Sequence, residues 1–369
     1  MHDHTARRFF RTIFAVALFT GAAGLTAQPA RAQSAEPKTT EQVYKNITQL
    51  KGAPADQLVP SMQFIASSLD VECAFCHVQG KPELDDKPAK KTARDMMAMT
   101  AAINKNSFAG QRQVTCYSCH HGSSHPANMP PVLTSDAPAH AEARTAAPAS
   151  AAPTAADILD KYVSALGGEG AIKKITSRVM KGTVLAGGGE APIELFTKAP
   201  NKRISISHNP NGDSFTAFDG TSGWMGNTGR PARDMPPEGS EAAGLDAEFY
   251  LGLRMKEIFA QLRPGRPEEI GGVECVQLIG TRPNHPPVRF YFDSKSGLLQ
   301  RLVRYAETPL GRNATQIDYA DYREVEGVKI PFRWTLARPN GRFTIQISEV
   351  KVNVPLEDGR FAKPAGEVK

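Results

Sequence analysis

Long hydrophobic runs are scarce in this chain, and the longest lies close to the amino terminus. It extends from Ile13 to about Ala27, is interrupted by glycines, and falls short of the ~20 apolar residues that a membrane-spanning helix needs. Arginines precede it at positions 7, 8 and 11, and Ala30-Arg31-Ala32 follows with the small-x-small pattern of a cleavage site. This order predicts a secretory signal peptide over residues 1–32 rather than an anchor, and therefore a periplasmic protein.

Clusters of basic residues are absent as well. The formal net charge is +6 over 369 residues, and no basic run is interleaved with aromatic residues. Nucleic acid binding is therefore not indicated. No cysteine lies near the predicted cleavage site, so a lipid anchor is not expected there. The hydrophobic fraction of 40% is sufficient for packed cores, and the length leaves room for two domains after processing.

Cysteine is the third scarce feature, because the whole chain has only five. Four of them belong to two similar stretches, "VECAFCHVQG" at Val71–Gly80 and "VTCYSCHHG" at Val114–Gly122. Each stretch places two cysteines three residues apart and a histidine directly after the second. Three chemistries use this cysteine spacing: a redox dithiol, half of a zinc site, and a covalently attached haem.

The surrounding sequence favours the haem. A redox dithiol of the thioredoxin type lies in a βαβ setting and needs no following histidine. Zinc ribbons separate their two pairs by ~15–20 residues, about half of the interval between Cys76 and Cys116. Haem attachment needs this spacing because two thiols three apart reach both vinyl groups on one macrocycle edge, which leaves the next imidazole under the iron. We therefore expect two covalently bound haem c groups, while a zinc site and a disulfide pair remain as alternatives. The expected attachment residues are Cys73, Cys76, Cys116 and Cys119, with His77 and His120 as proximal iron ligands.

Helical periodicity precedes each motif. The pattern predicts helices over about 39–51, from near Pro60 to just before the first cysteine pair, and over about 89–105. Six-coordinate iron needs a second axial ligand, and methionine is the usual one in cytochromes c. Met62 on the second helix is the candidate for the first haem. Three methionines of the third helix compete for the second haem: Met96, Met97 and Met99.

The chain divides at an Ala/Pro-rich stretch over 135–154, which is predicted to be a linker. It separates a dihaem unit over 33–134 from a second domain over 155–369. That domain starts with a helix and continues as segments of alternating polarity with Gly, Asn, Asp and Pro at the joints, a pattern typical of antiparallel strands. One further helix is expected at about 246–262. The fold class is thus α+β, with a small all-α unit followed by a curved antiparallel half-barrel that helices cover. We find no Ser-His-Asp or paired-carboxylate arrangement in this domain.

The haem segments resemble a known family. "PSMQFIASSLDVECAFCH" and "ARDMMAMTAAINKNSFAGQRQVTCYSCHHG" are similar to haem-binding segments of the cytochrome subunit of photosynthetic reaction centres. In that family a helix carries the axial methionine ahead of each motif, so the resemblance implies Met62 and Met96 as ligands and Met99 as a nearby non-ligand. It also implies electron transport in the light reaction of photosynthesis and a membrane-bound reaction centre as partner.

The second domain resembles another family. "LDKYVSALGG", "FDGTSGWMG" and "YADYREVEGVKIPFRW" are similar to the outer-membrane lipoprotein-sorting superfamily, whose half-barrels cradle acyl chains. This resemblance implies an apolar cavity and a possible apolar ligand.

The chain departs from the photosynthetic pattern in having two haem segments instead of four and no lipidated cysteine. A respiratory complex is therefore an equally good partner. We expect an electron carrier that is not an enzyme. A dihaem peroxidase-like enzyme, with one open iron position, and an apolar-ligand carrier with haem redox sensing are the alternatives. His121 and His125 are expected to be exposed polar residues, with a swapped iron ligand as the other interpretation.

Overall fold

The computed structural model describes residues 38–126 and 153–368, except for the single residues 188 and 340. The predicted signal peptide over 1–32 and nearly all of the predicted linker over 135–154 lie outside the described residues. Within the described residues, no helix is both long enough and apolar enough to span a membrane.

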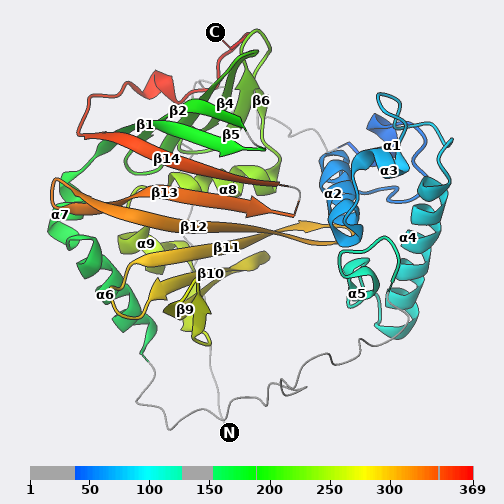
Figure 1. Ribbon diagram of the computed structural model, residues 1–369, viewed down its shortest axis with the longest axis horizontal. Coiled ribbons are helices and arrows are strands. Elements are labelled where there is room, and N and C mark those ends of the chain that lie inside the picture. The colour runs from blue at the N-terminus through cyan, green and yellow to red at the C-terminus, as the bar shows by residue number, and fades with distance from the viewer. Residues whose placement is uncertain (1–37, 127–152, 188, 340, 369) are drawn as a thin grey trace, which may run out of the picture. The chain divides into compact units, whose positions relative to one another are not determined.

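The segment over 38–126 is helical (Figure 1). The structure confirms the second and third predicted helices, as α2 and α4. Asp70 ends α2 in the left-handed conformation, directly before the first cysteine motif. Pro88 occupies the first position of α4, where its missing N–H costs no hydrogen bond. The elements are α1 Thr40–Val43, the 3₁₀ turn Ala55–Gln57, α2 Leu58–Leu69, α3 Cys73–Cys76, α4 Pro88–Ser107 and α5 Tyr117–His120.

The predicted helix over 39–51 is wrong in its length, because α1 ends after a single turn at Val43. The expected capping contact is present, with the Thr39 N–H donating to Gln42 Oε1 at 2.9 Å. The chain leaves the helical path at Tyr44, which is extended, and Asn46 follows with a φ of 58°. Its side chain donates to the Glu83 carbonyl at 2.5 Å and to Asp85 Oδ1 at 2.9 Å. These long-range bonds compete with helix continuation and hold the chain against another loop.

The domain over 153–368 is built on one open antiparallel sheet (Figure 1). Its main path in the described residues runs β6-β5-β4-β3-β2-β1-β14-β13-β12-β11-β10-β9-β7, with β8 paired to β9. The end strands β6 and β7 do not pair with each other there, so the sheet is a half-barrel and not a closed one. The strands are β1 Ser177–Ala186, β2 Gly189–Lys198, β3 Lys202–Asn209, β4 Gly212–Phe218, β5 Gly223–Asn227, β6 Arg233–Asp234, β7 Gln261–Pro264, β8 Glu268–Ile270, β9 Val273–Arg282, β10 His285–Asp293, β11 Leu299–Thr308, β12 Gly311–Val325, β13 Val328–Arg338 and β14 Gly341–Val352.

Four helices accompany the sheet: α6 Ala155–Leu166, α7 Glu169–Lys174, α8 Pro237–Ala247 and α9 Leu251–Ile258. The single helix predicted over 246–262 is therefore wrong: it is two helices and the start of a strand. The break lies at Phe249, whose side chain is buried and whose N–H donates to the Pro200 carbonyl at 3.0 Å. Beyond α9, Gln261 pairs with Thr281 as part of β7. The predicted α+β class with an antiparallel, helix-covered half-barrel is confirmed.

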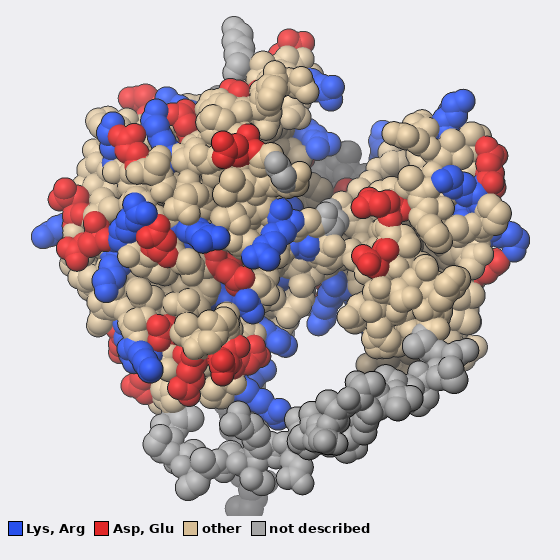
Figure 2. Space-filling model, in the orientation of Figure 1, with Lys and Arg blue, Asp and Glu red and all other residues tan. Residues whose placement is uncertain are grey.

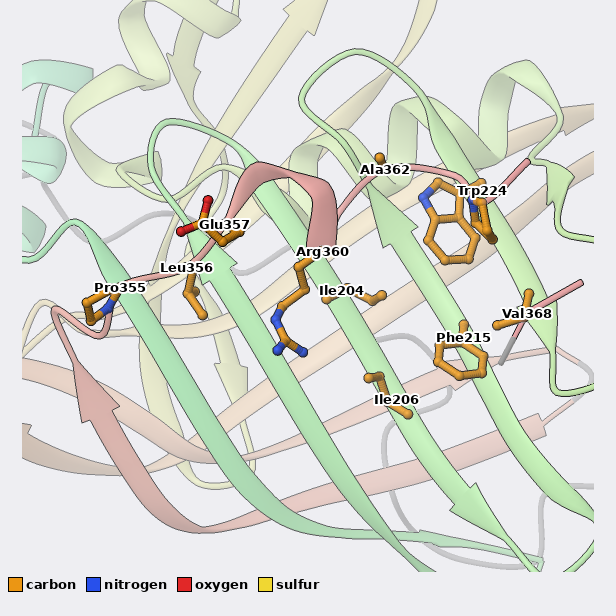
Figure 3. Close-up of a pocket in the computed structure, with 11 residues that line it drawn as sticks. Ile204, Ile206, Phe215, Trp224, Pro355, Leu356, Glu357, Arg360, Ala362 and Val368 are labelled. Atoms are coloured by element: carbon orange, nitrogen blue, oxygen red, sulfur yellow. The ribbon is translucent and has the colours of Figure 1, made fainter. Parts of the chain in front are cut away.

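Both faces of the sheet are packed. The inner face and the helices share two apolar clusters, which include Leu195 and Phe290, both fully buried. The outer face of β2–β5 carries a third cluster, since neighbouring residues of a strand point to opposite faces. The C-terminal segment after β14 covers this cluster (Figure 3). Phe361 is fully buried there, and its carbonyl accepts the Trp224 indole N–H at 2.8 Å.

Candidate functional site

The two cysteine motifs share a helical turn but differ at the histidine, since His77 is extended and His120 is helical. Each forms one helical turn, α3 and α5, in which the N–H of the histidine bonds back to the carbonyl of the first cysteine. These distances are 3.0 Å from His77 to Cys73 and 3.1 Å from His120 to Cys116. Residues three apart in a helical turn lie on one face, so each turn presents both of its thiols on the same side. The motifs therefore have the local geometry that attachment to one macrocycle edge requires.

Both histidines are held by the same kind of hydrogen bond. His77 Nδ1 lies 3.0 Å from the Pro82 carbonyl, and His120 Nδ1 lies 2.8 Å from the Ser123 carbonyl. A carbonyl oxygen only accepts, so Nδ1 carries the proton in each ring and Nε2 keeps a free lone pair. Histidines that ligate a metal usually donate their other ring N–H to such an acceptor. Both rings are thus in the tautomer that binds iron through Nε2.

Lys90, which the sequence interpretation did not single out, holds the loop that orients His77. Its side chain is buried, and its ammonium donates to the carbonyls of Pro82 and Leu84, each at 2.8 Å. It also lies 3.0 Å from Asp85 Oδ1. Hydrogen bonds from Asn46, Lys90 and Arg94 lower the pKa of Asp85, so this carboxylate stays ionised. The Pro82 carbonyl therefore accepts hydrogen bonds from both His77 Nδ1 and the buried Lys90 ammonium.

Asn104 holds the segment that precedes the second motif, as Lys90 holds the loop after the first. It is buried near the end of α4, where Oδ1 accepts the N–H groups of Gln113 and Val114 at 3.0 and 2.9 Å. Its Nδ2 donates to the Val114 carbonyl at 2.7 Å. Lys90 and Asn104 are 14 residues apart, close to four helical turns, and so lie on one face of α4. Polar residues on the inner face of an amphipathic helix are the signal that could have identified them.

The candidate axial methionines lie on α2 and α4. Met62 and Met97 are half-buried, whereas Met96 and Met99 are exposed by 37% and 45%. α3 packs against α4 and α5 packs against α2, so each methionine-bearing helix also contacts the motif of the other half. This cross-packing joins both halves into one unit. The choice of Met62 and Met96 as ligands stays a prediction.

The cysteines of the motifs are free thiols in the structure, as is Cys275. Burial raises the pKa of the Cys76 and Cys116 thiols. Within the described part of the chain, no three His, Cys, Asp or Glu side chains are grouped so as to hold a metal ion. Cys275 is fully buried in β9, where burial raises its pKa to about 11.

His121 and His125 are exposed, as expected for polar residues beside the motif. The His121 ring contacts the Tyr117 ring edge to face, with centroids 5.4 Å apart.

The helical segment buries few hydrophobic side chains of its own and is therefore suited to bind a large apolar group. Ile65 is the only hydrophobic residue that is buried between 38 and 126. Figure 2 shows Lys, Arg, Asp and Glu scattered among other residues on both the helical segment and the sheet domain. Several large hydrophobic side chains of the helical segment are exposed. Two porphyrins on the thiol-bearing turns would cover much of this apolar surface. The large hydrophobic residues exposed in this segment are Val43, Tyr44, Val59, Phe75, Met96, Met99, Phe108 and Tyr117.

Comparison with known proteins gives one family match. The family model for the photosynthetic reaction centre cytochrome C subunit matches residues 15–189, which include the whole helical segment. The cytochrome c subunit of the Thermochromatium tepidum reaction centre is 32% identical over 95 residues, or 25% of this chain. The match spans only 23% of that relative's length.

The solved structures compared with this chain each cover about half of it. A putative outer membrane lipoprotein-sorting protein domain from Vibrio parahaemolyticus is 11% identical, with 51% of this chain and 90% of that chain covered and a TM-score of 0.39. A LolA superfamily protein from Nitrosomonas europaea is 15% identical, with 57% and 99% covered and a TM-score of 0.39. The helical segment that contains both cysteine motifs is therefore similar to the cytochrome subunit family of photosynthetic reaction centres.

Proposed function

We propose that this protein is a periplasmic dihaem c-type cytochrome that transfers electrons between redox partner proteins. The observation that carries the proposal is the pair of similar helical turns at residues 73–77 and 116–120. Each combines two thiols on one helical face with a histidine whose Nδ1–H donates to a backbone carbonyl. The similarity to a reaction centre cytochrome subunit supports the same conclusion.

The site residues have distinct roles in this proposal. Cys73 and Cys76 would attach the first haem and Cys116 and Cys119 the second, through thioether bonds. His77 and His120 would bind the irons from one side, while Met62 and Met96 would do so from the other. A bound haem supplies reversible one-electron chemistry. The protein would orient the imidazoles through the Pro82 and Ser123 carbonyls, and with protein ligands on both irons no position would be left for a substrate, which is why we propose a carrier and not an enzyme.

The partners follow from the same resemblance. A membrane-bound reaction centre or a respiratory complex would exchange electrons with the dihaem unit over 33–134. Export by the signal peptide over 1–32 would place the protein in the periplasm. The alternative functions are a dihaem peroxidase-like enzyme and a carrier of an apolar ligand. The second is favoured by a cavity of about 650 Å³ beneath the helices of the sheet domain.

The haem count tests the proposal. Exported to a periplasm that contains the haem-attachment machinery, the mature chain should have an intact mass that includes two haems and lacks the residues before Gln33. Peptide mapping should place one haem on each motif. Replacing Cys116 and Cys119 with serine should remove one haem and leave the other, whereas replacing Cys275 should remove none. A chain with no haem, or with zinc in its place, would contradict the proposal.

A further inference from the structure

The inner face of the half-barrel encloses a cavity of about 650 Å³. This volume is within the range of roughly 300–1,000 Å³ that small-molecule sites occupy. Strands β1–β4 and β12–β14 form one wall, and residues of α6, α8 and α9 form the other (Figure 1). All of these elements belong to the domain over 153–368, so the cavity does not depend on the haem motifs.

One wall carries a row of polar side chains. Arg178 on β1 pairs with Thr197 on β2, and Thr197 pairs with Arg203 on β3. Directly paired residues of neighbouring strands lie on the same face, with Cβ atoms about 4.5–5.5 Å apart. All three residues line the cavity. The register therefore places a threonine between two arginines on the inner wall.

The hydrogen-bonding groups of this row are only partly satisfied within the described chain. The Thr197 side chain is 8% exposed, and its Oγ1 has no hydrogen-bond partner there. Arg178 Nε is buried without a partner, and neither arginine forms an ion pair with a described carboxylate. Of the two acidic residues of the lining, Asp246 pairs with Arg304, and Glu248 pairs with Arg254 at 2.8 Å through Oε2, while Glu248 Oε1 is buried without a hydrogen-bond partner in the described residues. Buried polar groups are normally satisfied, so the row has unused capacity for an anion.

Arg178 is held in place although it has no anion. Its guanidinium lies 4.1 Å from the centroid of the Phe249 ring and donates to the Phe249 carbonyl at 3.3 Å. Burial lowers its pKa to about 10, which still leaves the group charged at neutral pH. Burial lowers the pKa of Arg203 as well. A positioned cation with a free N–H is the usual receptor for a carboxylate or a phosphate.

The rest of the wall changes in polarity from one side to the other. β3 and β4 contribute hydroxyls to the lining, from Ser205, Ser207, Ser214 and Thr216. β1, β2, β13 and β14 contribute apolar side chains, from Met180, Ile193, Leu195, Trp334 and Ile345. A purely apolar molecule would leave the cationic row unpaired, and a small inorganic anion would leave the apolar wall uncovered. An amphiphile satisfies both.

We propose that this cavity binds a single-chain amphiphile with one anionic oxygen head group, which the row Arg178–Thr197–Arg203 recognises. The head group is a carboxylate or a phosphate, and the alkyl chain lies along the apolar wall. The proposal goes beyond electron transfer and does not rest on it, because no haem-motif residue takes part. It also differs from an apolar-ligand site in requiring the negative charge.

Calorimetric titration of the full-length holoprotein tests the charge requirement. After delipidation, dodecanoate, dodecyl phosphate and dodecanol are compared below their micellar concentrations. At least one of the two anions should bind with a stoichiometry of one per chain and at least tenfold more tightly than dodecanol. The ratio of the two anions' affinities identifies the preferred head group. Equal affinity of all three, or binding of none, would overturn the proposal.

Variants test the row itself. Arg203→Gln and Thr197→Val should each weaken binding of the preferred anion at least threefold and leave dodecanol unchanged. Arg333→Gln is the matched control, because Arg333 is an exposed arginine of β13 outside the cavity lining. Far-ultraviolet melting curves establish that each variant is folded. If a variant is not folded, the comparison of the three ligands on the wild-type protein alone tests the proposal. Unaltered anion affinity in both folded row variants would refute the assignment.

Discussion

Replacing Met62 with alanine should leave both haems attached but convert one iron from low spin to high spin. The thioether bonds through the cysteines are untouched, whereas the open iron position should now bind carbon monoxide. The reduction potential of that haem should fall, because methionine ligation raises it. Axial ligands set haem potentials over a range of about 0.8 V, so the shift should be large. The visible spectrum and a carbon monoxide titration measure both effects.

Two further variants make this result specific. Met96→Ala should produce the same change at the other haem, and the double variant should convert both irons. Met99→Ala is the control, since Met99 lies on the same helix as Met96 and is also exposed. A low-spin spectrum in Met62→Ala would mean that Met62 only fills space between α2 and its neighbours. A high-spin spectrum in Met99→Ala alone would assign the second ligand differently.

Without haem, residues 33–135 should have no stable fold, whereas the chain from Thr154 onward should fold by itself. Ile65 is the only buried hydrophobic residue over 38–126, and so few apolar contacts cannot offset the entropy of ordering the chain. Porphyrin binding would then be coupled to folding, as metal binding is in small metal-dependent domains. The sheet domain has three apolar clusters of its own, and Thr154 caps its first helix.

Circular dichroism of the separate pieces measures this difference. The haem-free N-terminal piece should give a disordered spectrum, and the isolated sheet domain should melt cooperatively. The full holoprotein should show two unfolding transitions, which are monitored by the haem absorption and by the far-ultraviolet signal. A sheet domain that fails to fold alone, or a single shared transition, would mean that the two units share a core. The boundary at 154 would then be wrong.

Local sequence patterns predicted the parts of this fold that local forces decide. α2 and α4 have sustained apolar periodicity and were predicted at nearly their observed positions. Alternating polarity likewise predicted that the second domain is built of antiparallel strands. The predicted helix boundaries were wrong where a contact with a residue distant in the sequence determined the backbone conformation. Asn46 is tied to the loop at Glu83, which ends α1 early, and Phe249 is tied to Pro200, which splits the predicted helix over 246–262.

The candidate sites show the same division. The spacing of the cysteines and histidines is local, so the motifs could be identified from the sequence alone. Lys90 and Asn104 support those motifs through loops whose positions only the tertiary structure defines. The row of Arg178, Thr197 and Arg203 depends on the register of three strands and on a cavity wall. No short pattern in the sequence encodes such a register.

A redox titration of the wild-type holoprotein, monitored by visible spectroscopy, tests whether two haems with saturated irons carry the electrons. Two one-electron steps should appear. Both oxidised irons should be low-spin, with the weak band near the red edge of the spectrum that marks methionine–iron bonds. High-spin iron at either haem, together with turnover of added peroxide, would contradict the claim and favour the peroxidase alternative.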